Sequence, residues 1–64
     1  MESDKVRKLL SRSEANCMLA LSLHGLLTLS GQIDLARLVW LVYNNSSLVA
    51  EICGDELEVE AKVV

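Results

Sequence analysis

Three residues of this chain, Cys17, His24 and Cys53, carry side chains that can bind a metal ion or take part in nucleophilic catalysis. Cys17 and His24 are seven residues apart, which would place them on the same side of a helix. A structural zinc site normally takes four protein ligands at closer spacing, and His24 is the only histidine. A catalytic Cys–His pair would also need an orienting group and an oxyanion hole, and no motif indicates either. The sequence therefore predicts no metal, no cofactor and no catalytic residue, and we expect a protein that is not an enzyme.

Cys17 and Cys53 are also too few for the disulfide framework that small secreted domains use. We expect two reduced, buried thiols, and a disulfide within or between chains is the alternative. The N-terminal segment lacks the apolar stretch of a signal peptide. The longest strictly apolar run, residues 38–43, is far shorter than the roughly 20 residues of a membrane-spanning helix. We therefore expect a cytoplasmic protein without a membrane span.

Acidic and apolar residues alternate in the C-terminal stretch ELEVEAKVV, and a period of two is typical of a strand with one apolar face. Gly54-Asp55 suits a two-residue turn, so the pattern predicts an antiparallel β-hairpin over residues 47–63 with Glu51 opposite Glu58. Paired carboxylates can act as acid and base, but an open two-stranded face offers no pocket for catalysis. We expect the acidic face to bind a basic partner surface, with protection of an exposed strand edge as the alternative. The partner-binding residues are expected to be Glu51, Glu56, Glu58 and Glu60.

The stretch before this hairpin is rich in helix-forming residues. Ser11 and Glu14 fit a capping box, which predicts helices over residues 4–10 and 12–29, and one unbroken helix from residue 4 is the alternative. Leucines also alternate with other residues within 17–29, so a β-hairpin is the alternative to a helix there. Ser30-Gly31 predicts a stop, and a further helix is expected over residues 33–44. The predicted fold is α+β in a single domain, 1–64: two to three helices followed by a C-terminal antiparallel β-hairpin.

Self-association is expected from the size and composition of the chain. A domain of about 60 residues buries only about 60% of the surface that its unfolded chain exposes. This chain has 64 residues, of which 52% are hydrophobic, so it carries more apolar surface than one such core can hide. Trp and Tyr are enriched at interaction hot spots, and both occur on the predicted helix 33–44. We therefore predict a homodimer with an interface formed by Ala36, Val39, Trp40 and Tyr43.

Charge is distributed unevenly along the chain, whose net charge is -3. The basic residues gather near the start, and the negative total argues against nucleic acid, because phosphate contacts need concentrated Lys and Arg. We expect a non-enzymatic protein–protein interaction or regulatory module that dimerises and presents its acidic hairpin face, as a small inhibitor or phage-type protein could. The alternative is a small dimeric DNA-binding transcriptional regulator. That protein would use the basic N-terminal helix, with Lys5, Arg7, Lys8 and Arg12.

Overall fold

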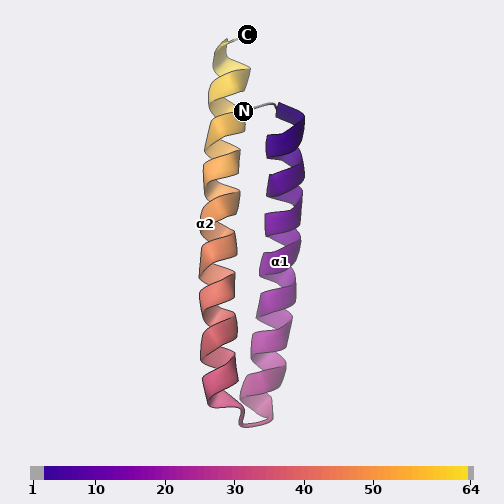
Figure 1. Cartoon of the computed structure of the whole chain (residues 1–64), viewed down its shortest axis with the longest axis vertical. Helices are drawn as coiled ribbons and strands as arrows, with labels where there is room; N and C mark the ends of the chain where they lie inside the picture. The colour runs from indigo at the N-terminus through magenta and orange to yellow at the C-terminus, as the bar shows by residue number, and fades with distance from the viewer. Residues whose placement is uncertain (1–2, 64) are drawn as a thin grey trace.

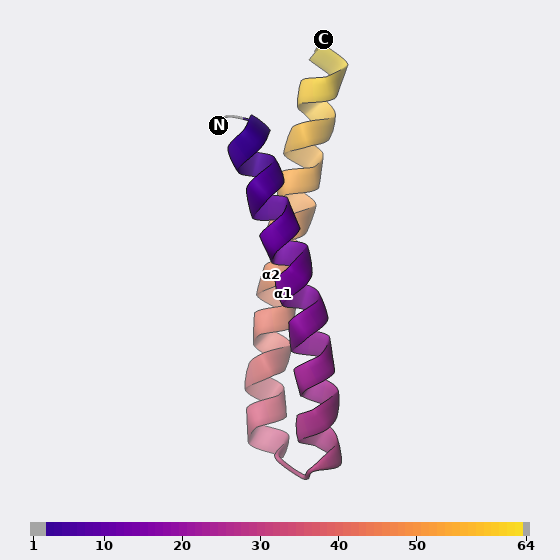
Figure 2. The ribbon, with the colours of Figure 1, turned by 90° about the vertical axis from the view of Figure 1, so that its right-hand side faces the viewer.

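The computed structural model of the chain is a helical hairpin, and it describes residues 3–63. Helix α1 (Ser3–Leu29) and helix α2 (Ile33–Val63) run antiparallel along a rod of 50 × 14 × 13 Å (Figure 1). The start of α1 and the end of α2 lie at one end of the rod, the open end, and the connecting turn lies at the other, the loop end. Seen from the side, the two helices cross at a shallow angle (Figure 2).

A tight turn after Leu29 reverses the chain at the loop end. Gly31 has φ +78°, the left-handed conformation that glycine adopts without steric cost. The Gly31 amide donates to the Thr28 carbonyl at 3.1 Å, and the Gln32 amide donates to the Leu27 carbonyl at 2.8 Å. These two bonds form a Schellman motif, which satisfies carbonyls that the end of a helix leaves unpaired. The turn at Ser30-Gly31 that the sequence indicates is therefore present.

The two helices pack through a seam whose positions recur alternately every three and four residues. Such a spacing averages 3.5 residues and is that of a left-handed coiled coil, in agreement with the shallow crossing. Many seam residues are small, so the two helix axes can approach closely. The buried and half-buried seam positions are Val6, Leu10, Ser13, Cys17, Ala20, His24 and Leu27 on α1, and Ala36, Val39, Tyr43, Ser46, Ala50, Cys53 and Leu57 on α2.

The predicted β-hairpin over residues 47–63 is wrong, because α2 continues to Val63 and residues 3–63 contain no strand. The fold is all-α instead of α+β. The residues of this segment, mainly Glu, Leu, Ala, Val and Lys, include several strong helix formers. Gly54 lies inside α2 without a positive φ, so it makes no turn. Glu51 and Glu58 are consequently two turns apart on one helix and do not face each other across two strands.

The other helix boundaries also differ from the main prediction. Helix α1 runs through Ser11–Glu14 without a break, which corresponds to the unbroken helix that the sequence left as the alternative. Residues 17–29 are helical throughout. Asn44 and Asn45 do not end α2; both are exposed within it. The seam continues on both sides of this pair, and its packing outweighs the low helix propensity of asparagine.

Candidate interaction surface

The hairpin leaves most of its large apolar side chains in contact with solvent. The buried hydrophobic residues are Val6, Ala20, Ala36 and Cys53, and only Val6 among them is a large side chain that is fully buried. Exposed Leu, Ile, Val, Met and Trp side chains far outnumber these four, with exposed fractions from 42% to 88%. Monomeric soluble proteins rarely expose contiguous apolar patches of more than a few hundred Å². The surface of this hairpin is therefore the feature to explain.

Ten aliphatic side chains line one side of the rod beside the seam, and we call this surface the apolar flank. They follow the same seven-residue repeat as the seam, so they stay on one side along the length of both helices. Nine of them are 42% to 69% exposed, and Val49 is half-buried. The apolar flank consists of Leu9, Leu19, Leu23 and Leu26 on α1, and Leu35, Leu38, Val42, Val49, Ile52 and Val59 on α2.

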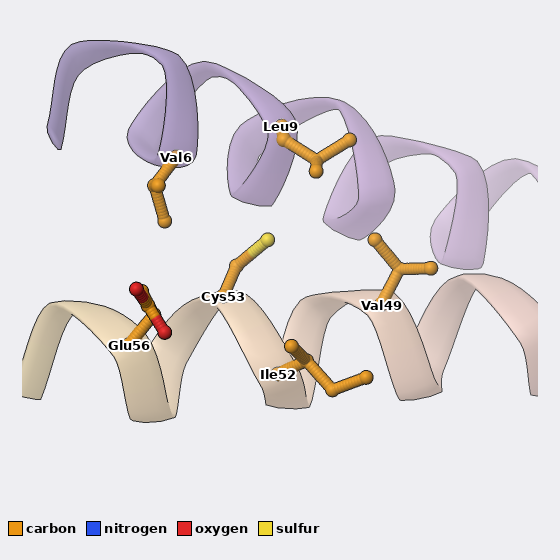
Figure 3. A pocket seen from close by; sticks show the side chains of 6 residues that line it. All are labelled: Val6, Leu9, Val49, Ile52, Cys53 and Glu56. Atoms are coloured by element: carbon orange, nitrogen blue, oxygen red, sulfur yellow. The ribbon is translucent and has the colours of Figure 1, made fainter. Parts of the chain in front are cut away.

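Two shallow grooves run between the helices on the apolar flank. The groove nearer the open end has a volume of about 280 Å³ and is lined by Val6, Leu9, Val49, Ile52, Cys53 and Glu56 (Figure 3). In this view Val6 projects from α1 toward α2, and Cys53 projects from α2 toward α1. The second groove, of about 220 Å³, is lined by Asn16, Leu19, Ala20, Leu23, Val39 and Val42. Aliphatic side chains form most of the walls of both grooves, so the grooves suit apolar side chains of another helix.

The other side of the rod, which we call the opposite flank, carries more charge. Both ion pairs found among residues 3–63 have a member there: Asp4–Arg7 at 3.7 Å and Glu58–Lys62 at 3.2 Å. All four side chains are largely exposed, so the pairs add little to stability. Exposed apolar residues on this side and on the outer faces of the helices are interrupted by charges and gather toward the loop end. They are Met18, Leu21, Leu29, Ile33, Trp40, Leu41 and Leu48.

The residues predicted to form the dimer interface lie mainly inside the hairpin. Ala36 is buried, and Val39 and Tyr43 are half-buried in the seam, where Cys17 Sγ lies 3.9 Å from the Tyr43 carbonyl oxygen. Trp40 lies on the opposite flank, 42% exposed, stacked on Tyr43 with ring centroids 5.0 Å apart. All four residues thus already contact α1 of their own chain, Trp40 through the His24 ring, whose centroid lies 5.1 Å from its own. Their role between subunits stays a prediction.

The four glutamates predicted to bind a partner are all exposed on α2, but they do not share one face. At 3.6 residues per turn Glu51 and Glu58 point about 20° apart, both on the opposite flank. Glu56 lines a groove on the apolar flank, and Glu60 accepts a hydrogen bond from Ser3 Oγ near the seam. The single acidic face of the predicted hairpin is therefore divided among three parts of the helix surface. Binding of a basic partner stays a prediction.

The basic residues of the alternative function lie on the first three turns of α1. Lys5 and Arg12, seven residues apart, share the side of the apolar flank, Lys8 lies on the outer face, and Arg7 lies on the opposite flank beside Asp4. No residue of this group is buried. DNA binding through this helix stays a prediction.

The two thiols are free and far apart. Cys17 is level with Tyr43, and Cys53 is level with Val6 and Leu9, so nearly three helical turns, or roughly 15 Å, separate them along the rod. A disulfide needs Cα atoms closer than about 7 Å. In the described part of the chain, 3–63, no three His, Cys, Asp or Glu side chains gather as metal ligands. Within the same residues, neither helix combines the length and apolar character that crossing a membrane requires.

The sequence-based prediction missed the apolar flank. The signal was present in the spacings of four and three that join Leu19, Leu23 and Leu26, and in the matching pattern of Leu35, Leu38 and Val42. Comparisons of the chain with protein-family models, with curated proteins and with solved structures found no match.

Proposed function

We propose that this chain is a non-enzymatic protein–protein interaction module that works as a homodimer, with the apolar flank as its dimer interface. The observation that supports this proposal is the extent of the flank, whose aliphatic side chains occupy most of its positions along both helices. Covering ten side chains of which about half is exposed would remove on the order of 800 Å² per protomer from water. That area corresponds to an interface of standard size.

A second copy of the chain suits this surface for two reasons. Both helices contribute aliphatic side chains of similar size, so the flank can pack against itself across a two-fold axis. A lone hairpin with four buried hydrophobic residues has little core to offset the entropy of folding, and small scaffolds of this kind usually need an additional source of stability. Pairing two hairpins through their flanks would produce a four-helix bundle with a continuous core.

The proposed dimer leaves the opposite flank in solvent. Glu51 and Glu58 would stay accessible on it, together with Asp4 and Arg7 of α1. A basic partner, as expected from the sequence, would meet these two glutamates and not a four-residue stripe. The module would thus use one side of the rod for self-association and the other for any further contact.

A matched pair of substitutions tests the interface. Leu38 lies on the apolar flank and Leu41 on the outer face of the same helix, with exposed fractions of 60% and 58%. Light scattering after gel filtration at micromolar concentration should give twice the chain mass of 7.0 kDa for the unmodified protein. Leu38→Glu should abolish the dimer or raise its dissociation constant at least about tenfold, because it places an unpaired charge in an apolar interface. Leu41→Glu should leave the mass unchanged.

Helicity is measured alongside the mass by circular dichroism. Loss of helix together with the dimer in Leu38→Glu agrees with the proposal, since the folded hairpin depends on its partner. Leu41→Glu controls for a general intolerance of α2 to a glutamate in this region. An unmodified protein that stays a helical monomer at about 100 μM, or two variants that weaken the dimer equally, would contradict the proposal.

A further inference from the structure

We infer that the two copies lie with their loops at the same end, so that α1 of each packs antiparallel on α2 of its partner and Lys5 of one approaches Glu56 of the other. This inference rests on the proposed dimer and adds its orientation and register. It states which helix of the second copy each helix packs against in the four-helix bundle. The composition of the flank alone does not determine this.

Two symmetric arrangements can bring the apolar flanks together. A two-fold axis parallel to the rod keeps both loops at one end and places α1 over α2 of the partner. A two-fold axis perpendicular to the rod puts the loops at opposite ends and places α1 over α1 and α2 over α2. Both arrangements bury the same side chains, so the distinction depends on which residues come to lie opposite each other.

Contacts within the hairpin show which residues share a height along the rod. Cys17 is level with Tyr43, and the His24 ring lies 5.1 Å from the ring of Trp40. Leu9 and Ile52 line the same groove near the open end. A two-fold axis parallel to the rod preserves height, so each residue of α1 faces the residue of the partner's α2 that is at its own level.

With the parallel axis, six of the seven facing pairs between Lys5 and Leu26 join side chains of the same or complementary kind, and the seventh places Arg12 opposite the partner's Val49. In five of these pairs like residues meet: four pairs are aliphatic, and Asn16 faces the partner's Asn45. In the sixth pair Lys5 faces the partner's Glu56, which has the opposite charge. The polar pairs matter most, because buried polar groups need partners. From the open end to the loop end, the six matched pairs are Lys5 with Glu56, Leu9 with Ile52, Asn16 with Asn45, Leu19 with Val42, Leu23 with Leu38, and Leu26 with Leu35.

The perpendicular axis inverts height about the middle of the rod, near Asn16. Lys5 would then lie over Leu26 of the partner subunit, and Glu56 over Leu35 of the partner subunit. Each charge would lose water to a leucine without gaining an opposite charge, which is unfavourable. Charged pairs at an interface discriminate between orientations in this way.

The charges of the open half agree with the parallel axis. The open end of α1 carries Lys5, Lys8 and Arg12, and α2 carries Glu51, Asp55 and Glu56 at similar heights. With loops at the same end, the basic part of α1 in each copy lies beside the acidic part of α2 in the other copy. With loops at opposite ends, each charged half would lie over the leucine-rich loop half of the other copy, whose only ionised side chains within residues 17–44 are Asp34 and Arg37.

Distances between spin labels decide the orientation. The background is Cys17→Ala/Cys53→Ala, checked first for the mass of a dimer, and labels are attached through Gln32→Cys at the loop end or Asp4→Cys at the open end. With loops together, helix axes about 10 Å apart bring either pair of labels within about 25 Å. With loops apart, the Gln32→Cys labels would be separated by close to the 50 Å length of the rod. A monomer contradicts the proposed function itself, whereas a dimer with long label distances contradicts only the orientation.

Charge exchange tests the Lys5–Glu56 contact. Lys5→Glu and Glu56→Lys should each raise the dissociation constant of the dimer about three- to tenfold at low salt, and the double variant should recover most of this loss. The matched control combines Glu56→Lys with Lys8→Glu, which has the same total charge but changes a residue on the outer face of α1; it should not recover. Recovery by the control to the same extent, or no recovery in the double variant, would overturn the contact.

Discussion

Replacing Gly54 with alanine should stabilise the protein. Gly54 lies inside α2, half-buried, and a β-carbon built there meets no atom within 4 Å. The substitution therefore adds no clash, and it removes the conformational entropy that glycine loses in a helix, about 0.5–1 kcal/mol relative to alanine. We expect the free energy of unfolding to rise by this amount for each chain. For a domain of this size, about 1 kcal/mol shifts the melting temperature by roughly 4–8 °C.

Thermal unfolding followed by far-UV circular dichroism measures the shift, at one fixed chain concentration because the stability of a dimer depends on it. Gly25→Ala is the matched positive control, since Gly25 also lies inside a helix with no atom within 4 Å of an added β-carbon. Gly31→Ala is the negative control and should cost about 1–2 kcal/mol, because Gly31 is left-handed at φ +78°. A fall in melting temperature for Gly54→Ala, with Gly25→Ala behaving as expected, would refute a continuous α2.

Two further pairs of substitutions test the seam and the flank by denaturant unfolding. Ala20→Leu should lower the free energy of unfolding by about 1–3 kcal/mol, because Ala20 is buried where the helices approach each other. Ala15→Leu, on the exposed outer face of α1, should change the free energy of unfolding by less than about 0.5 kcal/mol. Equal effects of the two substitutions would contradict the close packing of the seam. Leu23→Ala on the apolar flank should cost about 2–4 kcal/mol, like a core truncation, and Leu21→Ala clearly less. Their exposed fractions of 46% and 45% in the single hairpin are nearly equal, so equal losses would count against the dimer interface.

The turn of the hairpin was predictable from the sequence because local chemistry determines it. Ser30-Gly31 follows a long helix-forming stretch, and glycine is the residue that adopts the left-handed conformation required at a helix end. No contact with the rest of the chain is needed to specify this position. The seam was much harder to predict from the sequence. Its spaced Ser, Ala and Cys residues form a core only when a second helix packs against them.

The β-hairpin was predicted wrongly because a helix with two apolar stripes imitates a strand. Leu57 belongs to the seam and Val59 to the apolar flank, so residues two apart in sequence fall on two separate stripes, about 160° apart around the helix. The same relation joins Ala50 to Ile52. Alternation over a few residues therefore does not separate the two structures. The seven-residue spacing of Ala36, Tyr43, Ala50 and Leu57 does, because it holds over the length of α2.

The surplus of apolar residues was readable from composition, but the surface that carries it was not. Trp40 and Tyr43 were predicted at the interface because they are aromatic. In the helix, however, Tyr43 lies in the seam and Trp40 lies on the opposite flank. The residues of the apolar flank are ordinary leucines, valines and isoleucine, and no side chain among them is distinctive. Only the pairing of two helices shows which of them share a side.

The sizes of the side chains explain why the hairpin calls for a second layer. Seam positions such as Ser13, Ala20 and Ala36 are small, whereas leucines such as Leu19 and Leu23 lie on the flank. Stabilisation by burial scales with apolar area, so a hairpin that folded alone would gain most by placing its leucines in the seam. The observed distribution instead produces a thin two-helix layer with its larger apolar surface outside. Such a layer is stable when another layer covers that surface, and the proposed partner copy supplies one of matching length and pattern.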